Sequence, residues 1–426
     1  MAEKFGSRTS FIMASVGSAV GLGNLFRFPA LAIKYGSVFV IVYIFLLLLL
    51  GLPMLMSELA LGRKYGGSAV NSIKGARPAF VSVGWLSSAN AFVIMTYYCL
   101  LFSYVLLAAF FSIKLIGKAP NDAGNIFNSL IYPEGFPVFG CVFLIFGWAA
   151  VMLCFGDAER LGKISTIGVV FASAVIGIMA VVGGFSHPQG LVEFLKLSPR
   201  HMLSADFWLD TLGQVFFSLS VMVGVMPAYG SYLKKQESIS FCAVIIAFFD
   251  LLISLAATVI YTCAKAQGSE GLFACFSVYP KAFAQIGEGI GGIVAFLFYL
   301  SVAVLCLDSI FSYLKSVSAV LSEKLGIAES RASADLSLFS AFLGFFLLGS
   351  RGRPVVEYLD GEVVPLISLI IGFFEALLFS RLVDSGLLRE INLNARIKVP
   401  RNFLRFSLAF LSPAAIIILL FAQIFF

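Results

Sequence analysis

Apolar segments long enough to cross a lipid bilayer recur along the whole chain, and they constrain its fold more than any other feature. They lie at about residues 9–34, 38–62, 80–113, 136–156, 161–184, 207–233, 238–264, 288–322, 332–350, 361–384 and 403–426. About 20 apolar residues of helix span the hydrocarbon core, where unpaired backbone groups are too costly for irregular structure. The sequence therefore predicts an all-α polytopic membrane protein with about eleven transmembrane helices.

The composition supports this class and leaves little for catalysis. Hydrophobic residues make up 60% of the 426 residues and charged residues only 12%, a balance foreign to soluble domains. The seven cysteines lie in or beside apolar segments without metal-ligand spacing, and His187 and His201 fall in one polar loop. We therefore expect no enzyme and no nucleic-acid partner, and we expect the lipid bilayer to surround the chain.

Lysine and arginine gather in alternate connections between the predicted helices. One set, which includes Arg63, Lys64, Lys234 and Lys235, holds roughly twice as many as the other, so the positive-inside rule applies. This bias predicts a cytoplasmic N-terminus in a multi-pass protein of the cell inner (plasma) membrane. No small-residue cleavage site follows the first span, so we expect that span to be retained.

The first predicted span is interrupted by residues that a membrane helix rarely holds. Within Gly17–Pro29 stand three glycines, an asparagine, an arginine and a proline. A spanning helix is broken only where protein or a polar cavity satisfies the freed backbone groups. The freed carbonyls and Asn24 therefore predict oxygen ligands for a small ion and a polar solute. The alternative is a glycine face for helix packing, which covers Gly17 and Gly21 but leaves Asn24 and Arg27 unexplained.

A second interrupted span follows five spans later. The stretch Gln214–Pro227 again places hydroxyls, an amide, glycine and proline inside an apolar segment. Interrupted helices at matching positions of two halves indicate an inverted-repeat transporter that binds its cargo at the breaks. The alternative is that Ser218 and Ser220 bond only to their own helix.

The eighth predicted span contains Asp308 next to Ser309, with no basic residue one turn away. An unpaired carboxylate inside the membrane either binds a proton or finds a cation. A carboxylate, a hydroxyl and several carbonyl oxygens suit sodium, because hard cations prefer oxygen ligands. A proton relay is the competing interpretation of Asp308.

These three stretches make the chain similar to the neurotransmitter:sodium symporter family over nearly its whole length. The run GSAVGLGNLFRFP at Gly17–Pro29, with Gly51–Pro53 and Glu58–Arg63, carries the resemblance. The resemblance implies a prokaryotic amino acid transporter of the leucine-transporter type (LeuT-type fold), with a 5+5 inverted repeat whose helices 1 and 6 are broken. The repeats would comprise residues 1–184 (helices 1–5) and 185–384 (helices 6–10), followed by an additional helix 11 in residues 385–426.

The resemblance also implies two sodium sites and one amino acid site. The first sodium would bind Ala19, Asn24, Ser218 and Thr262, and the second would bind Gly17, Val20, Leu305, Asp308 and Ser309. The substrate would lie against Ala19, Gly21, Leu22, Gly23, Ile94, Tyr98, Phe217, Ser218, Ser220, Met222, Val223, Ser309 and Tyr313.

Gly21 separates two substrate classes within the family. Relatives that transport amines carry an aspartate there, whereas glycine leaves the negative charge to the substrate itself. Backbone N–H groups at Leu22 and Gly23 and the Tyr98 hydroxyl would receive a substrate carboxylate at a helix end. Because the remaining pocket residues are mostly apolar, the expected cargo is a neutral, hydrophobic amino acid.

The same resemblance supplies two gates. Arg27 and Asp360 would close the external side above Phe217, while Tyr232 and Glu323 would belong to an inner network. The family's N-terminal arginine and tryptophan are not matched there; the nearest residues are Lys4, Phe5 and Arg8.

Chloride dependence stays open at this stage. Relatives bind chloride near the first sodium or carry a fixed acid there, and this chain has the chloride-type groups Tyr43, Gln214 and Ser218. Ala266 stands where the acid or a serine is expected, so either Asp250 or a bound proton would have to compensate the charge.

The function implied is sodium-driven amino acid uptake by alternating access. Alternatives are a sodium-dependent transporter of another amine, an osmolyte or a modified amino acid, and a sodium and amino acid sensor that no longer transports. An ion channel fits less well, because no filter segment is repeated and two gates imply occlusion.

Overall fold

The chain is helical throughout the part that the computed structural model describes. That part comprises residues 5–113, 140, 143–144, 147–148, 158–186, 188–263, 275–284, 290–347 and 352–425, and it contains no β-strand. Its α-helices are α1 (Arg8–Ala19), α2 (Phe28–Tyr35), α3 (Ser37–Leu46), α4 (Leu52–Tyr65), α5 (Ala69–Ala76), α6 (Val81–Ser112), α9 (Ala158–Ser186), α10 (Pro188–Leu195), α11 (Ala205–Ser218), α12 (Val225–Tyr232), α13 (Ile239–Cys263), α14 (Cys275–Ala284), α15 (Ile290–Leu325), α16 (Glu329–Phe346), α17 (Gly352–Tyr358), α18 (Val364–Leu382), α19 (Leu388–Ile391), α20 (Arg401–Phe406) and α21 (Ser412–Phe425).

Several of these helices join through single π-helical turns into longer spans. The turns are Gly23–Arg27, Leu47–Gly51, Leu359–Val363, Val383–Leu387 and Ser407–Leu411. Among the described residues, seven helical stretches are long and apolar enough to cross a membrane, and an eighth is the bent pair Arg8–Ala19 and Gly23–Tyr35.

These eight spans correspond to eight of the eleven predicted apolar runs. The run at 207–233 is divided between the short helices α11 and α12, and the run at 332–350 matches α16. The run at 136–156 falls mostly outside the described residues. The polytopic helical class is therefore confirmed, while the count of eleven stays a prediction.

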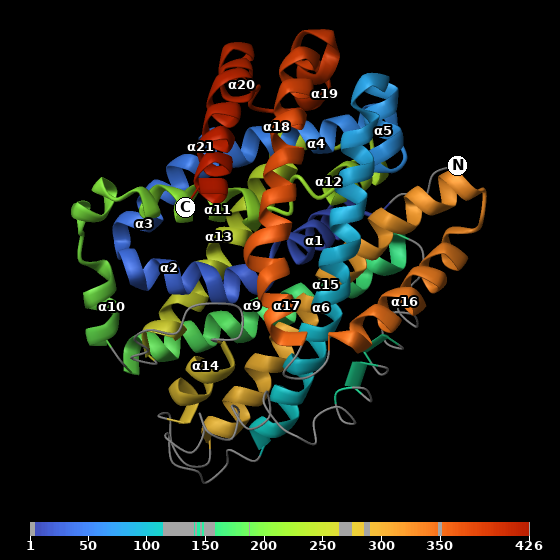
Figure 1. The fold of residues 1–426 in the computed structure, drawn as a ribbon. Coiled ribbons are helices and arrows are strands. Elements are labelled where there is room, and N and C mark those ends of the chain that lie inside the picture. Colours follow the sequence, from blue (N-terminus) through green and yellow to red (C-terminus); the bar gives the residue numbers. More distant parts are fainter. Residues whose placement is uncertain are drawn as a thin grey trace.

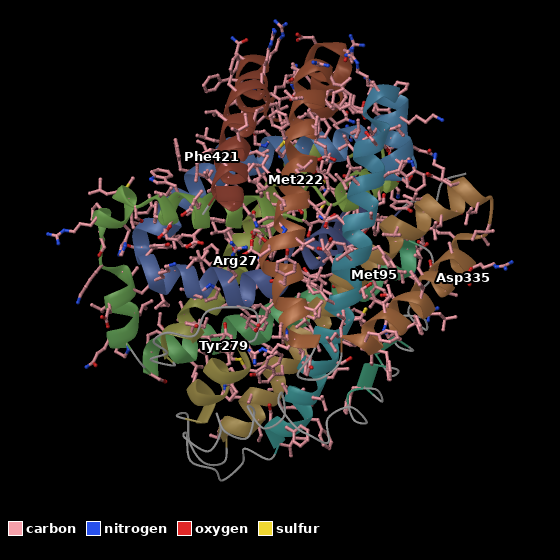
Figure 2. All side chains as sticks on the ribbon, in the orientation of Figure 1. Arg27, Met95, Met222, Tyr279, Asp335 and Phe421 are labelled. Carbon is pink, nitrogen blue, oxygen red and sulfur yellow. The ribbon has the colours of Figure 1, made fainter. Side chains whose placement is uncertain are left out.

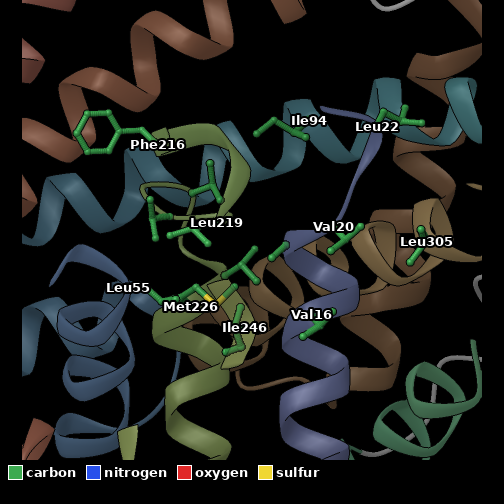
Figure 3. Close-up of a cluster of buried hydrophobic side chains, with 14 of the residues drawn as sticks. Val16, Val20, Leu22, Leu55, Ile94, Phe216, Leu219, Met226, Ile246 and Leu305 are labelled. Carbon is green, nitrogen blue, oxygen red and sulfur yellow. The ribbon is translucent and has the colours of Figure 1, made fainter. Parts of the chain in front are cut away.

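The first predicted break is present in the structure. Helix α1 ends at Ala19, Val20 is extended with φ −78° and ψ 97°, and the chain resumes helical turns at Gly23. The two half-helices meet at 60°. Figure 3 shows the chain leaving α1 near Val20 and running to Leu22 without a helical turn.

The second predicted break is also present, between α11 and α12. The link Leu219–Gly224 contains Ser220, Met222 and Gly224 in the left-handed region, with φ of 51°, 66° and 73°. For residues other than glycine this conformation costs about 1–2 kcal/mol each, so surrounding contacts must hold it. The Ser220 hydroxyl donates to the Ser18 carbonyl at 2.7 Å, which ties this break to the first one.

The broken helices lie at the centre of the molecule (Figure 1). Helix α1 packs against α9, α13 and α15, while α12 packs against α4 and α11 packs against α3. Helices α4 and α12 touch through backbone, because a side chain at Gly62 would collide with the Pro227 carbonyl. Apolar side chains from several helices, including Val16, Leu55 and Leu305, fill the space around the links (Figure 3).

Candidate substrate and sodium sites

A single cavity of about 330 Å³ joins the two breaks. It is lined by both links, by Lys34 and Asp210, and by residues of the neighbouring helices α6, α15 and α18. The predicted substrate residues that line it are Ala19, Gly21, Gly23, Ile94, Tyr98, Phe217, Ser218, Ser220, Val223, Ser309 and Tyr313. Leu22 and Met222 are the two predicted substrate residues that do not line it.

One end of the cavity is polar and built around Gly21. A Cβ added at Gly21 would lie 3.3 Å from the Tyr98 hydroxyl and 3.6 Å from the Ser309 hydroxyl. The Leu22 backbone N–H lies close to the same Tyr98 hydroxyl, so Leu22 contributes its backbone even though its side chain is buried elsewhere. Backbone N–H groups and a phenol hydroxyl at a helix break form an arrangement that suits a carboxylate.

The other end is mainly apolar and aromatic. Ile94, Val223 and Tyr313 contribute to it, and the Tyr98 and Tyr313 rings meet edge to face with centroids 5.9 Å apart. The prediction for Met222 is corrected, because its side chain turns away from the cavity and packs against Gly372 of α18. Its left-handed backbone directs the side chain there.

A first cluster of oxygen atoms lies beside the polar end. The Asn24 amide nitrogen is 2.6 Å from Asp250 Oδ1, 2.9 Å from the Ser254 hydroxyl and 3.0 Å from the Ser218 hydroxyl. Ser218 also donates to Asp250 Oδ2 at 2.6 Å, and Tyr43 donates to the same atom at 3.2 Å. All five side chains are buried. We call Tyr43, Asn24, Ser218, Asp250 and Ser254 the first oxygen cluster.

The structure corrects the contribution that α13 makes to this cluster. Thr262 was expected beside Asn24, but its hydroxyl donates to the Val259 carbonyl at 2.7 Å. It lies twelve residues beyond Asp250 on the same helix, which is about 18 Å at 1.5 Å per residue. Asp250 and Ser254, one turn apart, take the place expected of Thr262.

The spacing Asp250, Ser254 and Thr258 is the signal that could have found this face of α13 from the sequence. Polar residues at every fourth position of an apolar span lie on one side of the helix and face the interior. Ala266, expected near the first sodium, lies outside the described residues.

A second cluster lies where α1 packs against α9 and α15. Asp308 Oδ1 accepts the Ser165 hydroxyl of α9 at 2.8 Å, while Asp308 Oδ2 has no partner among the described residues. A side chain at Gly17 would collide with this carboxylate, and the Ser309 hydroxyl is 3.3 Å from the Gly17 carbonyl and 3.2 Å from that of Leu305.

This second oxygen cluster comprises Gly17, Leu305, Asp308, Ser309 and Ser165. Sequence reasoning found four of its members and missed Ser165, because one serine on an unbroken helix carries no distinguishing signal. Val20, the fifth residue predicted for this site, is the extended residue that caps α1, and its N–H still donates to the Val16 carbonyl at 2.7 Å.

The three residues predicted to form an external gate, Arg27, Phe217 and Asp360, all line the cavity. The Arg27 guanidinium lies 5.7 Å from the centre of the Phe217 ring, and Asp360 accepts the Tyr97 hydroxyl at 2.9 Å. Both Arg27 and Asp360 line the cavity, and within the described chain they form no direct ion pair. Figure 2 shows Arg27 near the centre of the molecule, below Met222.

The end of the molecule that carries Phe5 is closed by aromatic and charged contacts. Phe5 packs edge to face on Tyr229 and Tyr232, with ring centroids 5.9 and 6.1 Å apart. Glu323 accepts the Ser68 N–H at 2.8 Å and the Ser68 hydroxyl at 2.5 Å. Lys4, one of the nearest substitutes for the family's N-terminal arginine, lies outside the described residues.

Lys315 is the residue at this end that sequence reasoning missed. Its side chain is only 4% exposed, its ammonium lies 2.9 Å from Glu329, and it stands 5.4 Å from the centre of the Tyr232 ring. A buried lysine therefore ties α12, α15 and α16 together. Removing one partner of a buried ion pair typically costs about 3–5 kcal/mol, so this contact outweighs an exposed one.

Replacing Lys315 with methionine is expected to loosen this end of the molecule. Because the cation that holds Tyr232 and Glu329 is lost, amide hydrogens of residues 225–233 should exchange about tenfold faster in a hydrogen–deuterium exchange measurement. Lys324→Met is the matched control, since this exposed lysine of the same helix bonds only Asn71 among the described contacts. Equal amide exchange rates in both variants would show that Lys315 does not help to close this end of the molecule.

Two broken helices joined by one cavity are the architecture of secondary transporters, a class that has no catalytic site. The sequence model of the sodium:neurotransmitter symporter family matches residues 2–125 and 135–426. The chain belongs to the sodium:neurotransmitter symporter family.

Several known proteins resemble this chain at similar levels of sequence identity. An uncharacterized sodium-dependent transporter of Methanocaldococcus jannaschii is 27% identical over 402 residues, which is 86% of this chain and 80% of the relative. A sodium-dependent serotonin transporter of Drosophila melanogaster is 26% identical over 430 residues, 88% of this chain and 68% of the relative. The crystal structure of MhsT in complex with L-phenylalanine matches with TM-score 0.86 and 25% identity, covering 100% of both chains. The LeuT-type fold is thereby confirmed.

Proposed function

We propose that this chain is a sodium-coupled symporter of a neutral amino acid with an apolar side chain, working by alternating access. The observation that carries the proposal is one cavity that reaches both helix breaks and is flanked by two buried oxygen clusters. Sodium is the cargo that such hard oxygen sites favour, and family membership supports sodium dependence.

The polar end of the cavity is matched to a free amino acid. Gly21 brings no charge of its own, so the Leu22 N–H and the Tyr98 hydroxyl are left to a substrate carboxylate. The substrate amine would meet carbonyl groups freed in the link near Phe217 and Ser220. The similarity to MhsT, which was solved with L-phenylalanine, supports the same substrate class.

The far end of the cavity favours an apolar side chain. Ile94, Val223 and Tyr313 surround it, and one methylene in such a pocket is worth about 1–3 kcal/mol. Discrimination among leucine, phenylalanine and similar amino acids therefore depends on small differences in shape.

Each oxygen cluster would hold one sodium ion. In the first, the Asn24 amide would rotate so that its oxygen joins Ser218, Asp250 and the Ala19 carbonyl around the ion. In the second, the Asp308 carboxylate and Ser309 hydroxyl would join carbonyls of Gly17, Val20 and Leu305. Ala19 and Val20 are adjacent, so ion binding at either site would order the same break that binds substrate.

Transport would proceed by alternate closing of the two ends. Arg27 and Asp360 would close over the substrate above Phe217, and the closure at Tyr232 and Glu323 would then open. We place the N-terminus in the cytoplasm and the chain in the cell inner (plasma) membrane, with residues 1–184 and 185–384 as the inverted repeats. At 100 mV each sodium charge carried inward contributes about 2.3 kcal/mol.

A binding screen tests the proposal. Purified protein is screened for thermal stabilisation by the common amino acids in sodium and in potassium. Stabilisation by neutral apolar amino acids in sodium alone is expected, because the pocket and both ion sites share the α1 break. Uptake against a gradient in proteoliposomes then separates a transporter from a sensor. A folded protein that responds to no amino acid in sodium would contradict the assignment and point to an amine or osmolyte.

A further inference from the structure

Two buried carboxyl groups lie outside both oxygen clusters. Glu58 belongs to α4 and Glu375 to α18, and neither side chain is exposed. The two carboxyl groups are close enough to interact electrostatically, and Met222 contacts both their surroundings, through its N–H at Glu58 and its side chain at Gly372. The sodium sites, the cavity lining and the gates make no use of this pair.

Three of the four carboxyl oxygens are unsatisfied. Glu58 Oε1 accepts the Met222 N–H at 2.7 Å, whereas Glu58 Oε2 and both oxygens of Glu375 have no partner among the described residues. A hydrogen bond between two carboxyl groups requires that one of them carries a proton. A buried carboxyl oxygen without a hydrogen-bond partner destabilises the folded state, and more so when the group is charged.

No cation in the described chain compensates the pair. On α4, Arg63 is bonded to Glu390 at 2.6 Å and Lys64 to the Ser385 carbonyl at 2.9 Å. On α18, Arg381 lies over the Phe80 ring at 5.9 Å.

The neighbouring elements add no charge either. The titratable group that each of the two carboxyls faces, among the described residues of the packed elements, is the other carboxyl. Two like charges in such a place cannot both persist, so one proton must be held between them.

The pair Glu58 and Glu375 contacts the link Leu219–Gly224 through Met222. Met222 lies between Val221 and Val223, which both line the cavity, and its left-handed backbone points its N–H at Glu58. Its side chain packs on Gly372, three residues before Glu375 on α18. Figure 2 shows Met222 in the centre of the molecule, above Arg27. A change in the shape of this link therefore changes the surroundings of both carboxyls.

We propose that Glu58 and Glu375 form a proton site whose occupancy is linked to amino acid binding at the adjacent link. With the link ordered, the Met222 N–H stabilises the Glu58 carboxylate and Glu375 holds the shared proton. When the link loosens without substrate, water reaches the pair and both groups ionise. Amino acid binding therefore takes up a proton from solution.

This inference rests on the proposed amino acid binding, and calorimetry tests the two separately. L-Phenylalanine, with L-leucine as a second probe, is titrated into the full-length protein at saturating sodium, in two buffers of different ionisation enthalpy. Saturating sodium keeps Asp250 and Asp308 bound to their ions, so their protonation does not change. At alkaline pH we expect the uptake of nearly one proton for each substrate molecule bound. The affinity for substrate should then fall by up to about tenfold for each unit by which the pH rises.

Glu375→Gln supplies a permanent amide donor in place of the proton. The variant should bind substrate with no proton uptake and with an affinity that no longer depends on pH. Glu357→Gln, at an exposed residue paired with Arg353, is the matched control and should behave as the wild type.

Three results would overturn the inference. They are unchanged uptake in the Glu375→Gln variant, wild-type binding without any uptake at any pH, or a further sodium ion bound at the pair in place of the proton. Wild-type binding without proton uptake is measured without any variant, so it tests the inference even if Glu375→Gln does not fold. Failure of the wild type to bind either probe in sodium would instead count against the proposed function.

Discussion

The Asp308→Ala variant is expected to lose sodium-dependent substrate binding almost completely. In the second oxygen cluster Asp308 is the only group with a full charge, and its Oδ2 atom is unpartnered within the described chain. A charge 4 Å from a cation is worth about 4 kcal/mol at an effective dielectric constant of 20. Losing it should weaken sodium binding at this site roughly a hundredfold or more, since each 1.4 kcal/mol is tenfold.

The measurement is substrate binding as a function of sodium concentration. Asp308→Asn tests the charge with less change in volume and should show the same direction of change. Asp335→Ala is the matched control, because Asp335 is an exposed aspartate of α16 whose partner is Arg331 (Figure 2). An Asp308→Ala variant that binds substrate with the wild-type sodium dependence would exclude this carboxylate as a sodium ligand.

The Asp250→Asn variant is expected to convert a chloride-independent transporter into a chloride-stimulated one. In the first oxygen cluster an ionised Asp250 would supply a negative charge beside the proposed sodium ion, and the Ser218 and Tyr43 hydroxyls donate to its carboxylate at 2.6 and 3.2 Å. With this carboxylate in place, an additional anion beside the first sodium would be repelled. Without it, the same hydroxyls and Ser254 become free to bind an anion from solution.

Uptake in chloride and in gluconate measures this effect. The wild type should transport equally in both salts. The uptake rate of Asp250→Asn should be at least about tenfold lower in gluconate than in chloride. Asp335→Asn serves as the control for an aspartate that touches neither ion site. A wild type that already requires chloride would show that Asp250 does not supply the compensating charge.

The two carboxylates give the two proposed ion sites different surroundings. Asp250 is bonded by hydroxyl and amide groups on both oxygens, so its charge is distributed within a closed network. Among the described residues, the Asp308 carboxylate has a single hydrogen-bond partner, Ser165, and its unpartnered oxygen approaches Gly17. We therefore expect the Asp308 site to exchange its ion more readily, since fewer protein hydrogen bonds hold its carboxylate.

The positions of both helix breaks could be predicted from the sequence. Glycines, polar residues and proline inside apolar runs are conspicuous because hydrocarbon tolerates broken backbone only where protein satisfies it. Asn24, Ser218, Asp308 and Ser309 were recognised for the same reason, and they lie at the two oxygen clusters. Their roles as sodium ligands remain a proposal.

Residues on unbroken helices were harder to assign. The sequence led us to expect Thr262 of α13 at the first oxygen cluster, whereas Asp250 and Ser254 of the same helix reach it. The sequence of a regular helix does not show how deep in the membrane each of its residues lies. The same limit explains the omission of Ser165 and Lys315, whose significance depends on Asp308, Tyr232 and other groups far away in sequence.

The sequence by itself determined the membrane class, the family, the two interruptions and the kinds of atoms available at them. These properties depend on local composition, since apolar length, glycine, proline and buried charge act within one segment. The tertiary structure alone decided which helix supplies Asp250, where the Met222 side chain turns, and that Glu58 meets Glu375. Such pairings depend on the depth and rotation of helices that are remote in sequence, which packing fixes and local pattern does not.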